Sequence, residues 1–326
     1  MIAAQTDKEN LAGVLKNFPT QILEASKLAA KINLNNIQNI VVCGMGGSGL
    51  PGDIARNLSN INVPFLTLKD YTLPAFIGKN SLVFIISYSG NTEETIAAYN
   101  EAKKRNAQIV IITSGGELAA KAKQDNLPLI LVPSGLQPRM AFGYQTIPIL
   151  TILENAGLTT AINWKVVASS LIAQSEHITS HAKEIVTFLK NKIPMIYASV
   201  AFSSAAYKWK IDFNENTKIH AFCNAFAEFN HNEINGYVNL NGNYAVIILR
   251  DQNDHPRIKK RMGIIADIIK KKNIPALTID TQGSDLPTRL LSIIWLGDWV
   301  SYYMALDINT DPTPVKIIED LKAQLK

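Results

Sequence analysis

A cluster of hydroxyl side chains around a glycine is the part of this sequence best suited to bind an anion. It reads Ser87-Tyr-Ser-Gly-Asn-Thr92, follows the apolar run 82–87 and precedes the amphipathic segment 92–105. A strand, a turn and a helix N-terminus together offer unpaired N–H groups and a positive dipole end. Three hydroxyls exceed the needs of one helix cap, so the segment predicts binding of a phosphate monoester. The alternative is an ordinary Ser/Thr cap, with Glu93 and Glu94 complementing the dipole.

A glycine-rich loop, Gly44-Met-Gly-Gly-Ser-Gly49, also follows an apolar run and precedes a helical segment. It matches the dinucleotide fingerprint G-x-G-x-x-G, which requires an acidic residue about 20 residues further on. Asp70 could supply that acid, so a nicotinamide-dependent oxidoreductase stays an alternative, as does a tight turn without a ligand. Against the oxidoreductase, we expect Pro51-Gly52-Asp53 to interrupt the binding helix, and the hydroxyls near Ser87 would have no role.

Short apolar runs alternate with amphipathic segments, which is typical of parallel sheets covered by helices on both faces. The N-terminal segment is predicted to be helical with a bend at Pro19, and a long helix is predicted over 164–190. Strands are predicted over 39–43, 65–69, 82–87, 108–113, 127–132, 194–199, 244–250 and 276–280. Further helices are predicted over 205–216, 256–272, 287–306 and 315–325.

The two halves of the chain resemble divergent copies of one unit. Residues 41–44 with their glycine loop correspond to 195–199, and residues 83–87 correspond to 245–249. The second copy has Arg250-Asp-Gln-Asn where the first has Tyr88-Ser-Gly-Asn. We therefore expect the first copy to bind the anionic ligand and the second to supply a surface for a domain or dimer partner.

Composition excludes several classes of protein. The chain has 326 residues, 47% hydrophobic and 18% charged, which fits two globular domains rather than a disordered chain. Its net charge is +5, and its densest basic cluster, Lys259–Arg261 with Lys270–Lys272, predicts a solvated helix face rather than a nucleic-acid-binding stripe. It has two cysteines, no signal-peptide pattern, and a longest apolar stretch that contains Asp298. We expect a cytoplasmic protein that neither spans a membrane nor binds nucleic acid.

Five motifs in order resemble the bifunctional phosphoglucose/phosphomannose isomerase family, a branch of the phosphoglucose isomerase superfamily. They are the segments 44–49, 87–94, 138–144, 213–218 and 228–233, and the resemblance extends over nearly the whole chain. It implies an α/β fold of two sugar isomerase (SIS)-like, flavodoxin-like domains, each a parallel sheet covered by helices. The division that follows is an N-terminal domain over 1–156, a linking helix over 157–190 and a C-terminal domain over 191–326.

The resemblance also implies roles for individual residues. The substrate phosphate would be bound by six residues of the two loops: Gly46, Gly47, Ser48, Ser87, Ser89 and Thr92. Arg139 would face the reacting carbons, and Glu215 would be the catalytic base. His231 would open the sugar ring, reaching in from the neighbouring subunit, and Lys316 would assist. His220 competes with His231 for the ring-opening role.

The implied reaction is the reversible isomerisation of glucose 6-phosphate and mannose 6-phosphate to fructose 6-phosphate, through ring opening and a cis-enediol. A carboxylate can carry the proton between C1 and C2, a guanidinium can stabilise charge on oxygen, and histidine titrates near neutrality. We expect a hexose 6-phosphate substrate, no cofactor, no metal, and a homodimer with a shared active site. A non-catalytic sugar-phosphate-binding protein stays an alternative, and it would need neither Glu215 nor His231.

Overall fold

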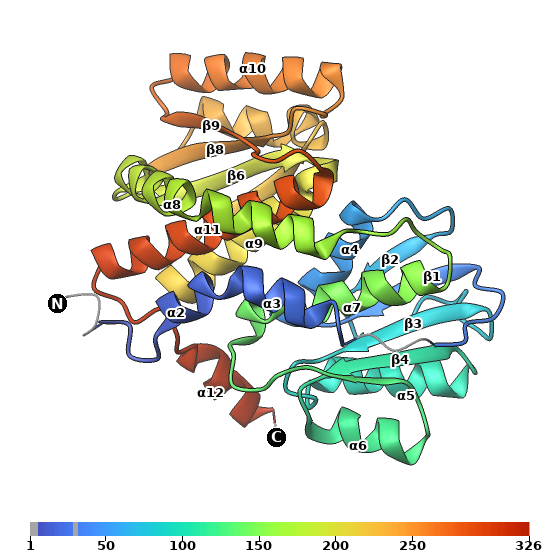
Figure 1. Ribbon diagram of the computed structural model, residues 1–326. Coiled ribbons are helices and arrows are strands. Elements are labelled where there is room, and N and C mark those ends of the chain that lie inside the picture. The colour runs from blue at the N-terminus through green and yellow to red at the C-terminus, as the bar shows by residue number, and fades with distance from the viewer. Residues whose placement is uncertain (1–5, 29–31, 326) are drawn as a thin grey trace. The chain divides into compact units, whose positions relative to one another are not determined.

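The computed structural model describes residues 6–28 and 32–325 (Figure 1). The chain forms two compact units: an N-terminal unit of residues 17–169, and a C-terminal unit of residues 170–326 together with the first residues up to Lys16. Helix α2 (Leu11–Lys16) belongs to the C-terminal unit, where Trp295 Nε1 donates a hydrogen bond to Leu15 O at 2.8 Å. The functional division at 1–156, 157–190 and 191–326 stays a prediction.

The N-terminal unit is built on a five-stranded parallel sheet. Its strands are β1 (Asn39–Cys43), β2 (Phe65–Leu68), β3 (Ser81–Ile86), β4 (Gln108–Thr113) and β5 (Leu129–Leu131). Every residue of β3 is buried, as expected for an unbroken apolar run with helices on both faces. The sheet confirms the fold class predicted from these runs.

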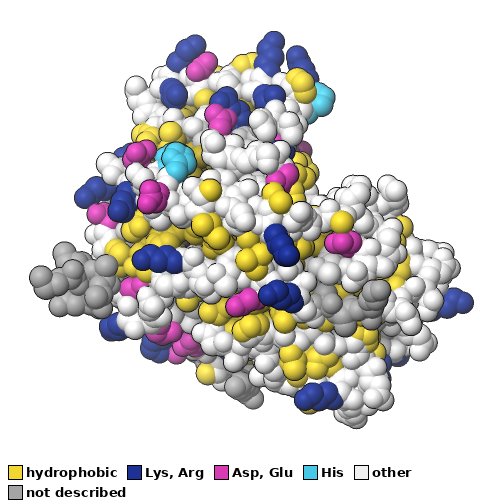
Figure 2. Space-filling view, in the orientation of Figure 1, with side chains coloured by type: hydrophobic (Ala, Val, Ile, Leu, Met, Phe, Trp, Pro, Cys, Tyr) yellow, Lys and Arg dark blue, Asp and Glu magenta, His cyan; other side chains and the backbone are white. Residues whose placement is uncertain are grey.

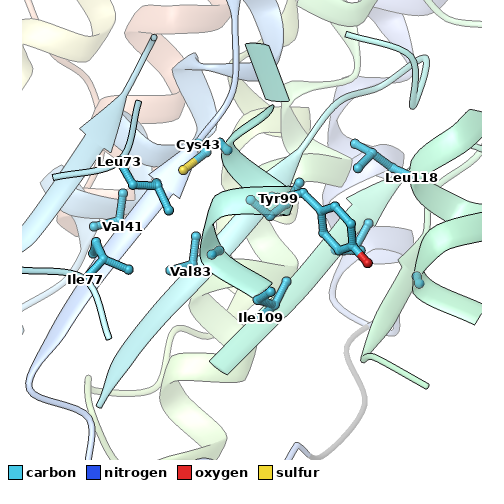
Figure 3. Close-up of a cluster of buried hydrophobic side chains, with 13 residues drawn as sticks. Val41, Cys43, Leu73, Ile77, Val83, Tyr99, Ile109 and Leu118 are labelled. Carbon is cyan, nitrogen blue, oxygen red and sulfur yellow. The ribbon is translucent and has the colours of Figure 1, made fainter. Parts of the chain in front are cut away.

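Helices cover both faces of this sheet (Figure 1). They are α3 (Phe18–Ala25), α4 (Leu50–Leu58), α5 (Glu93–Lys104), α6 (Gly116–Gln124) and α7 (Phe142–Asn155), with short 3₁₀ turns η1 (Gly46–Ser48) and η2 (Pro138–Met140). On the face covered by α5 and α6, Val41, Cys43 and Val83 of the strands pack with Tyr99 and Leu118 of the helices (Figure 3).

The strand order places two loops together at one edge of the sheet. The order is β2-β1-β3-β4-β5, so the chain leaves β1 toward one side and β3 toward the other. This is the flavodoxin-like order, and ligands of such sheets bind in the crevice beyond the carboxyl ends of the strands at this reversal. The loops after β1 and β3 are the two that carry the predicted phosphate-binding residues.

The C-terminal unit repeats this topology with four parallel strands. They are β6 (Ile193–Ser199), β7 (Phe222–Phe226), β8 (Tyr244–Arg250) and β9 (Ala276–Asp280), in the order β7-β6-β8-β9. Strands β6 and β8 occupy the places of β1 and β3, which confirms the predicted correspondence between the two halves.

Helices of the C-terminal unit also lie on both faces of its sheet (Figure 1). They are α9 (Ser203–Asp212), α10 (Pro256–Lys271) and α11 (Leu286–Asp307), with α12 (Lys316–Gln324) near the C-terminus; α8 (Trp164–Leu189) crosses the boundary between the units in sequence. Lys260, Lys270 and Lys271 are exposed on α10, as predicted for a solvated helix face, and basic side chains gather over this helix in Figure 2.

Several local expectations were wrong. The N-terminal helices separate at Asn17, and Pro19 lies in the first turn of α3, where its missing N–H costs nothing. Helix α4 runs through Pro51-Gly52-Asp53 for the same reason, so this segment does not interrupt a binding helix. Strand β7 was missed because Asn224 interrupts its apolar run and only its last residue is buried. None of the described helices combines the length and apolar character that a membrane span requires.

Candidate functional site

The hydroxyl side chains of the loop after β3 converge on Ser87. Ser87 Oγ lies 2.8 Å from Thr92 Oγ1 and 3.5 Å from Ser89 Oγ, and it accepts a hydrogen bond from the Gly90 N–H at 3.1 Å. Ser87 is buried, Thr92 is half-buried and Ser89 is exposed, so the three hydroxyls form a row that reaches the surface. Because hydroxyls rotate, they can exchange these contacts for the oxygens of an anion.

Thr92 occupies the N-cap position of α5, yet its side chain does not cap the helix. Its backbone is extended, with φ −74° and ψ 120°, and the hydroxyl contacts Ser87 instead of the first helical N–H groups. Those N–H groups and the positive end of the helix dipole therefore face the hydroxyl loop without a side-chain cap from Thr92. This geometry favours an anion site over the ordinary helix cap.

The glycine-rich loop after β1 is joined directly to the hydroxyl loop. Ser48 Oγ accepts a hydrogen bond from the Tyr88 N–H at 3.0 Å, which leaves the Ser48 proton for another acceptor. A Cβ on Gly47 would lie 2.6 Å from the backbone nitrogen of Arg139, so only glycine allows this approach. Gly90, at φ +72°, allows the tight turn of the other loop.

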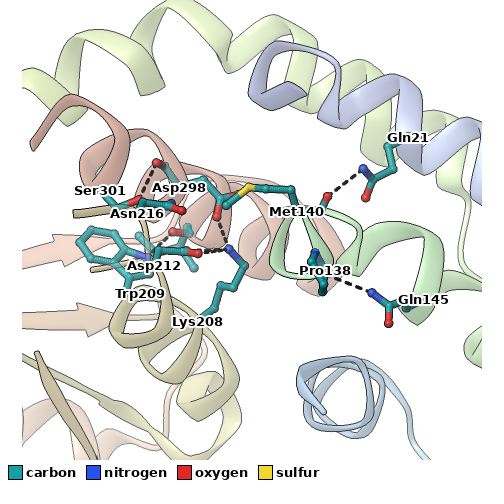
Figure 4. Close-up of polar contacts among 11 residues, drawn as sticks. Gln21, Pro138, Met140, Gln145, Lys208, Trp209, Asp212, Asn216, Asp298 and Ser301 are labelled. Atoms are coloured by element: carbon teal, nitrogen blue, oxygen red, sulfur yellow. Dashed lines mark hydrogen bonds and ion pairs between the residues drawn. The ribbon is translucent and has the colours of Figure 1, made fainter. Parts of the chain in front are cut away.

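Arg139 is fully buried in η2, and its backbone is held from both sides. Gln145 Nε2 donates to Pro138 O at 3.2 Å, and Gln21 Nε2 donates to Met140 O at 3.0 Å (Figure 4). Sequence reasoning identified Arg139 but missed both glutamines. The only available signal was an amide on the otherwise apolar faces of α3 and α7.

Tyr88 fixes the segment that leads to Arg139. Its hydroxyl donates to Pro133 O and accepts from the Leu136 N–H, both at 2.8 Å. Burial raises the pKa of Tyr88 above its ordinary value, so the side chain stays a neutral phenol able to make both hydrogen bonds. The hydroxyl loop and the Arg139 segment are therefore connected within the N-terminal unit.

The acid proposed for a nicotinamide ribose has a local partner. Asp70 is exposed, and its carboxylate accepts a hydrogen bond from the N–H of Tyr71 at 2.6 Å. The nearby Asp53 pairs with Lys69 at 2.7 Å. Neither contact is a specific feature of a dinucleotide-binding site, whereas the row of hydroxyls has the geometry of an anion-binding site.

Glu215 lies on a π-helical turn of the C-terminal unit. The turn covers Phe213–Thr217 and follows α9 without interruption; Glu215 is half-buried while Asn216 and Thr217 are buried. Lys218 Nζ donates to the backbone oxygen of Glu215 at 2.8 Å. Single π turns occur frequently at functional sites. The sequence predicted an ordinary helix over 205–216 and did not indicate this π turn.

The histidine candidates are both exposed. His231 ends the 3₁₀ turn Glu228–His231, and its side chain is exposed. His220 lies beside Phe222, with ring centroids 6.4 Å apart. The structure thus leaves both side chains open to solvent, and it does not decide between them for ring opening.

Lys316 is an exposed residue at the start of α12, where it pairs with Asp320 at 2.7 Å. The preceding segment does approach the Glu215 turn, because Lys218 Nζ donates to Asp311 O at 2.8 Å. The role of Lys316 stays a prediction.

The equivalent position in the C-terminal sheet has different chemistry. A cavity of about 560 Å³ lies beyond β6 and β8, with apolar walls and the buried residues Asp251, Asp254 and Arg289. Asp251 accepts from Arg289 Nε at 2.7 Å and from Thr281 Oγ1 at 2.5 Å, which ties β9 and α11 to the end of β8. Two aspartates and an arginine therefore lie where the N-terminal unit has its row of hydroxyls.

Two protein-family models match different parts of the chain. Residues 33–133 match the SIS domain family, and residues 178–325 match the bacterial phospho-glucose isomerase C-terminal SIS domain. The first match contains both loops at the reversal of the N-terminal sheet. The second contains Glu215, His220, His231 and Lys316.

Full-length relatives are also found. The bifunctional phosphoglucose/phosphomannose isomerase of Caldicellulosiruptor bescii is 38% identical and covers 95% of this chain and 97% of its own. The protein of the same name from Aquifex aeolicus is 35% identical, covering 90% of this chain and 92% of its own.

Solved structures share the fold. The C-terminal domain of glucosamine-fructose-6-phosphate aminotransferase from Francisella tularensis superposes with a TM-score of 0.73 at 15% identity, covering 92% of this chain and 97% of that one. Tagatose-6-phosphate ketose/aldose isomerase from Escherichia coli superposes with a TM-score of 0.65 at 16% identity, covering 96% and 92%. At these identities the similarity shows the fold alone.

Proposed function

Because the chain belongs to the bifunctional phosphoglucose/phosphomannose isomerase family, we propose that it interconverts glucose 6-phosphate and mannose 6-phosphate with fructose 6-phosphate. The observation that carries the proposal is the row of hydroxyls at Ser87, Ser89 and Thr92. This row meets Ser48 and an uncapped helix N-terminus at the strand reversal where such sheets bind ligands. Without an anion, three converging hydroxyls have no evident purpose.

The proposal assigns phosphate binding to the N-terminal unit. Gly46 and Gly47 keep the first loop free of side chains, and Ser48, Ser87, Ser89 and Thr92 supply hydroxyl donors. A phosphate dianion gains from these donors and from the α5 dipole without requiring a lysine or arginine. Neutral donors also let product leave, because the phosphate is not held by a full ion pair.

Ring opening precedes isomerisation in the proposed mechanism. The ring oxygen at C5 gains a proton while the hydroxyl at C1 loses one, which yields the open-chain aldehyde. We assign this transfer to His231 with help from Lys316, because an imidazole side chain can both donate and accept a proton. His220 stays the competing candidate for the same step.

Glu215 then transfers a proton between the two reacting carbons. Its carboxylate removes the proton from C2 of the aldose, giving a cis-enediol, and returns a proton to C1 to give the ketose. The Arg139 guanidinium stabilises the negative charge that develops on the enediol oxygens. Because C2 becomes planar in the enediol, glucose 6-phosphate and mannose 6-phosphate reach the same intermediate, which accounts for two substrates.

The proposal includes an assembly and a location. We infer a homodimer in which His231 serves the neighbouring subunit's site, and a cytoplasmic enzyme that acts on phosphorylated hexoses. The reaction moves protons within one substrate and leaves its overall oxidation state unchanged. It therefore calls for no external redox cofactor.

The test is a coupled assay of fructose 6-phosphate formation from glucose 6-phosphate and, separately, mannose 6-phosphate. We expect turnover of both by the wild type. Glu215→Gln should lower kcat by about 10²- to 10⁴-fold, because the amide cannot accept the proton, while hexose 6-phosphates still raise the melting temperature. Glu176→Gln, at an exposed position of α8, is the matched control and should keep full activity.

Two outcomes would point elsewhere. If neither sugar turns over while both still raise the melting temperature, the chain is a non-catalytic sugar-phosphate-binding protein. If NAD(P)H quenches the protein fluorescence and neither phosphate nor sugar phosphate competes, the glycine-rich loop binds a dinucleotide.

A further inference from the structure

A fully buried charged cluster in the C-terminal unit has no part in the mechanism above. Lys208 and Asp212 on α9 and Asp298 on α11 have at most 1% of their surface exposed. Lys208 Nζ donates to both oxygens of Asp212, at 2.5 and 2.6 Å, and to Asp298 Oδ1 (Figure 4). Three contacts thus join this ammonium group to two carboxylates.

Such a cluster requires a reason beyond stability. Removing three charged groups from water is costly, and apolar side chains often stabilise a core equally well. Burial is the largest influence on the pKa of Asp212 and raises it well above its ordinary value; the two aspartates raise the pKa of Lys208 despite burial. Lys208 therefore stays charged, and the cluster fixes its three side chains in one geometry.

The cluster lies directly before the turn that carries Glu215. Asp212 is the last residue of α9, and the π turn begins at the next residue. Lys208 and Asp212 are four residues apart on one face of α9, and Asp298 joins that face to α11. The ion pair of Lys208 with Asp298 therefore holds the entry to the π turn against α11, and Trp209 Nε1, which donates to Ile293 O at 2.7 Å, adds a second attachment.

The exit from the π turn is held to the same helix. Asn216 Nδ2 donates to Ser301 Oγ at 2.9 Å (Figure 4). Thr217 Oγ1 donates to Ser301 O at 2.9 Å. Ser301 Oγ in turn donates to Asp298 O at 2.8 Å. Asp298 and Ser301 are three residues apart, so one turn of α11 contacts both ends of the segment that contains Glu215.

We propose that Lys208, Asp298 and Ser301 are positioning residues that fix the Glu215 backbone through the two ends of the π turn. The inference rests on the proposed function, since it assumes that Glu215 is the base. None of the three touches the substrate in this proposal. A π turn has an extra residue per turn and gains less from helical hydrogen bonding than an α-helix, so external attachments at both ends are needed to hold one conformation.

If these residues position Glu215, their substitution should lower kcat by more than the accompanying loss of folding stability explains. A proton-transferring carboxylate must lie within hydrogen-bonding reach of two carbons, and a displacement near 1 Å can cost about 10²-fold. Ser301→Ala removes the hydroxyl that accepts from Asn216 Nδ2, and Asp298→Ala removes a carboxylate that accepts from Lys208. Each should lower kcat about tenfold or more and leave KM for glucose 6-phosphate within about twofold, because the phosphate site belongs to the other unit.

Two variants separate positioning from folding. Asp298→Asn keeps an acceptor oxygen for Lys208 and should retain most of the kcat that Asp298→Ala loses. Trp295→Phe removes a buried hydrogen bond of the same helix, from Trp295 Nε1 to Leu15 O, and keeps the hydrogen bonds of Asn216 and Thr217 to Ser301. It should lower the melting temperature comparably to Ser301→Ala while keeping kcat.

The decisive measurement is kcat and KM for these four variants, with melting temperatures recorded in parallel. If Ser301→Ala and Asp298→Ala keep kcat within about twofold at a lowered melting temperature, the cluster is structural only and the proposal is wrong. If the wild type itself shows no turnover, the proposed function fails, and the positioning role fails with it. Wild-type turnover with unaffected variants overturns the positioning role alone.

Discussion

At the scale of single residues, the oxygen of Ser87 is the most heavily used atom of the candidate phosphate site. It contacts the hydroxyls of Ser89 and Thr92 and accepts from the Gly90 N–H. Its loss removes one phosphate donor and also loosens the other two. Function at this site therefore depends on the arrangement of hydroxyls more than on any one of them.

Ser87→Ala should raise KM for glucose 6-phosphate about tenfold, since a hydrogen bond to a charged group contributes about 1.5–3 kcal/mol. The effect on kcat should be small, because the phosphate contact is made equally in the ground and transition states. Steady-state kinetics with both hexose phosphates measures this split.

Ser114→Ala is the matched control for Ser87→Ala. The Ser114 hydroxyl donates to Tyr88 O at 2.6 Å, beside the loop and outside the hydroxyl row. An equal rise in KM for the two variants would mean that the row has no special role in phosphate binding.

At the scale of elements, strand β1 and the loop after it illustrate how one segment serves both core and site. Cys43, the last residue of β1, is 1% exposed, and burial, with a smaller contribution from the charge of Glu101, raises the pKa of its thiol to about 12. The next residues form the glycine-rich loop. The core therefore ends immediately where the proposed site begins.

We expect Cys43 to be inert toward thiol reagents in the folded protein, because the thiolate is the reactive form and little of it is present at pH 8. Cys223 on β7 is half-buried and should react. Titration with an aromatic disulfide reagent should label one thiol natively and both in denaturant. Cys223→Ser should abolish the native reaction, and persistent labelling of that variant would contradict the burial of β1.

An ion pair between the neighbouring strands β8 and β9 should make the stability of the protein depend on pH. Arg250 donates to both oxygens of Asp280, at 2.6 and 2.8 Å, and this pairing holds the pKa of Asp280 below its ordinary value. A carboxyl whose pKa falls on folding stabilises the protein above its unfolded pKa of about 4. That contribution is lost as the pH falls through the folded pKa.

Asp280→Asn should lower the free energy of unfolding by about 0.5 kcal/mol at pH 7, a small value because both side chains are partly exposed. The difference from the wild type should shrink as the pH falls below about 4. Urea unfolding at pH 7, 5, 4 and 3 provides the comparison. A difference that stays constant with pH would show that the ion pair contributes nothing.

At the scale of the whole molecule, the proposed homodimer can be tested by mixing two inactive variants. Glu215→Gln lacks the base and His231→Ala lacks the ring-opening group. If His231 serves the neighbouring subunit, a hybrid dimer has one site with both residues intact. Random mixing should then restore roughly a quarter of wild-type activity, since half of the dimers are hybrids with one intact site of two.

Sedimentation of the wild type accompanies this experiment and establishes its oligomeric state. No recovery on mixing, with subunit exchange verified, would place His231 in its own subunit's site. A fully active monomer would exclude the dimer. Assaying His231→Ala and His220→Ala separately, before mixing, decides between the two histidines, because only the variant that lacks the ring-opening residue should be inactive by itself.

Much of this molecule could be predicted from the sequence because the signals are local. Apolar runs of four to six residues predicted strands such as β1, β3 and β4, and Asn39–Cys43 and Tyr244–Arg250 match the observed limits. A strand followed by small and hydroxyl residues already implies an anion-binding turn, since the chemistry lies within one loop. The family resemblance added the candidates Arg139, Glu215, His231 and Lys316.

The tertiary structure decided what depends on residues far apart in the chain. Ser48 and the Tyr88 N–H meet only because β1 and β3 are neighbours, and Lys208 meets Asp298 only because α9 packs on α11. The π turn at Glu215 has no signature of its own, because the same residues would fit an α-helix. A sequence determines which side chains are available to a site. Whether these side chains converge depends on how helices and strands pack together, because small differences in burial and hydrogen bonding select one packing geometry.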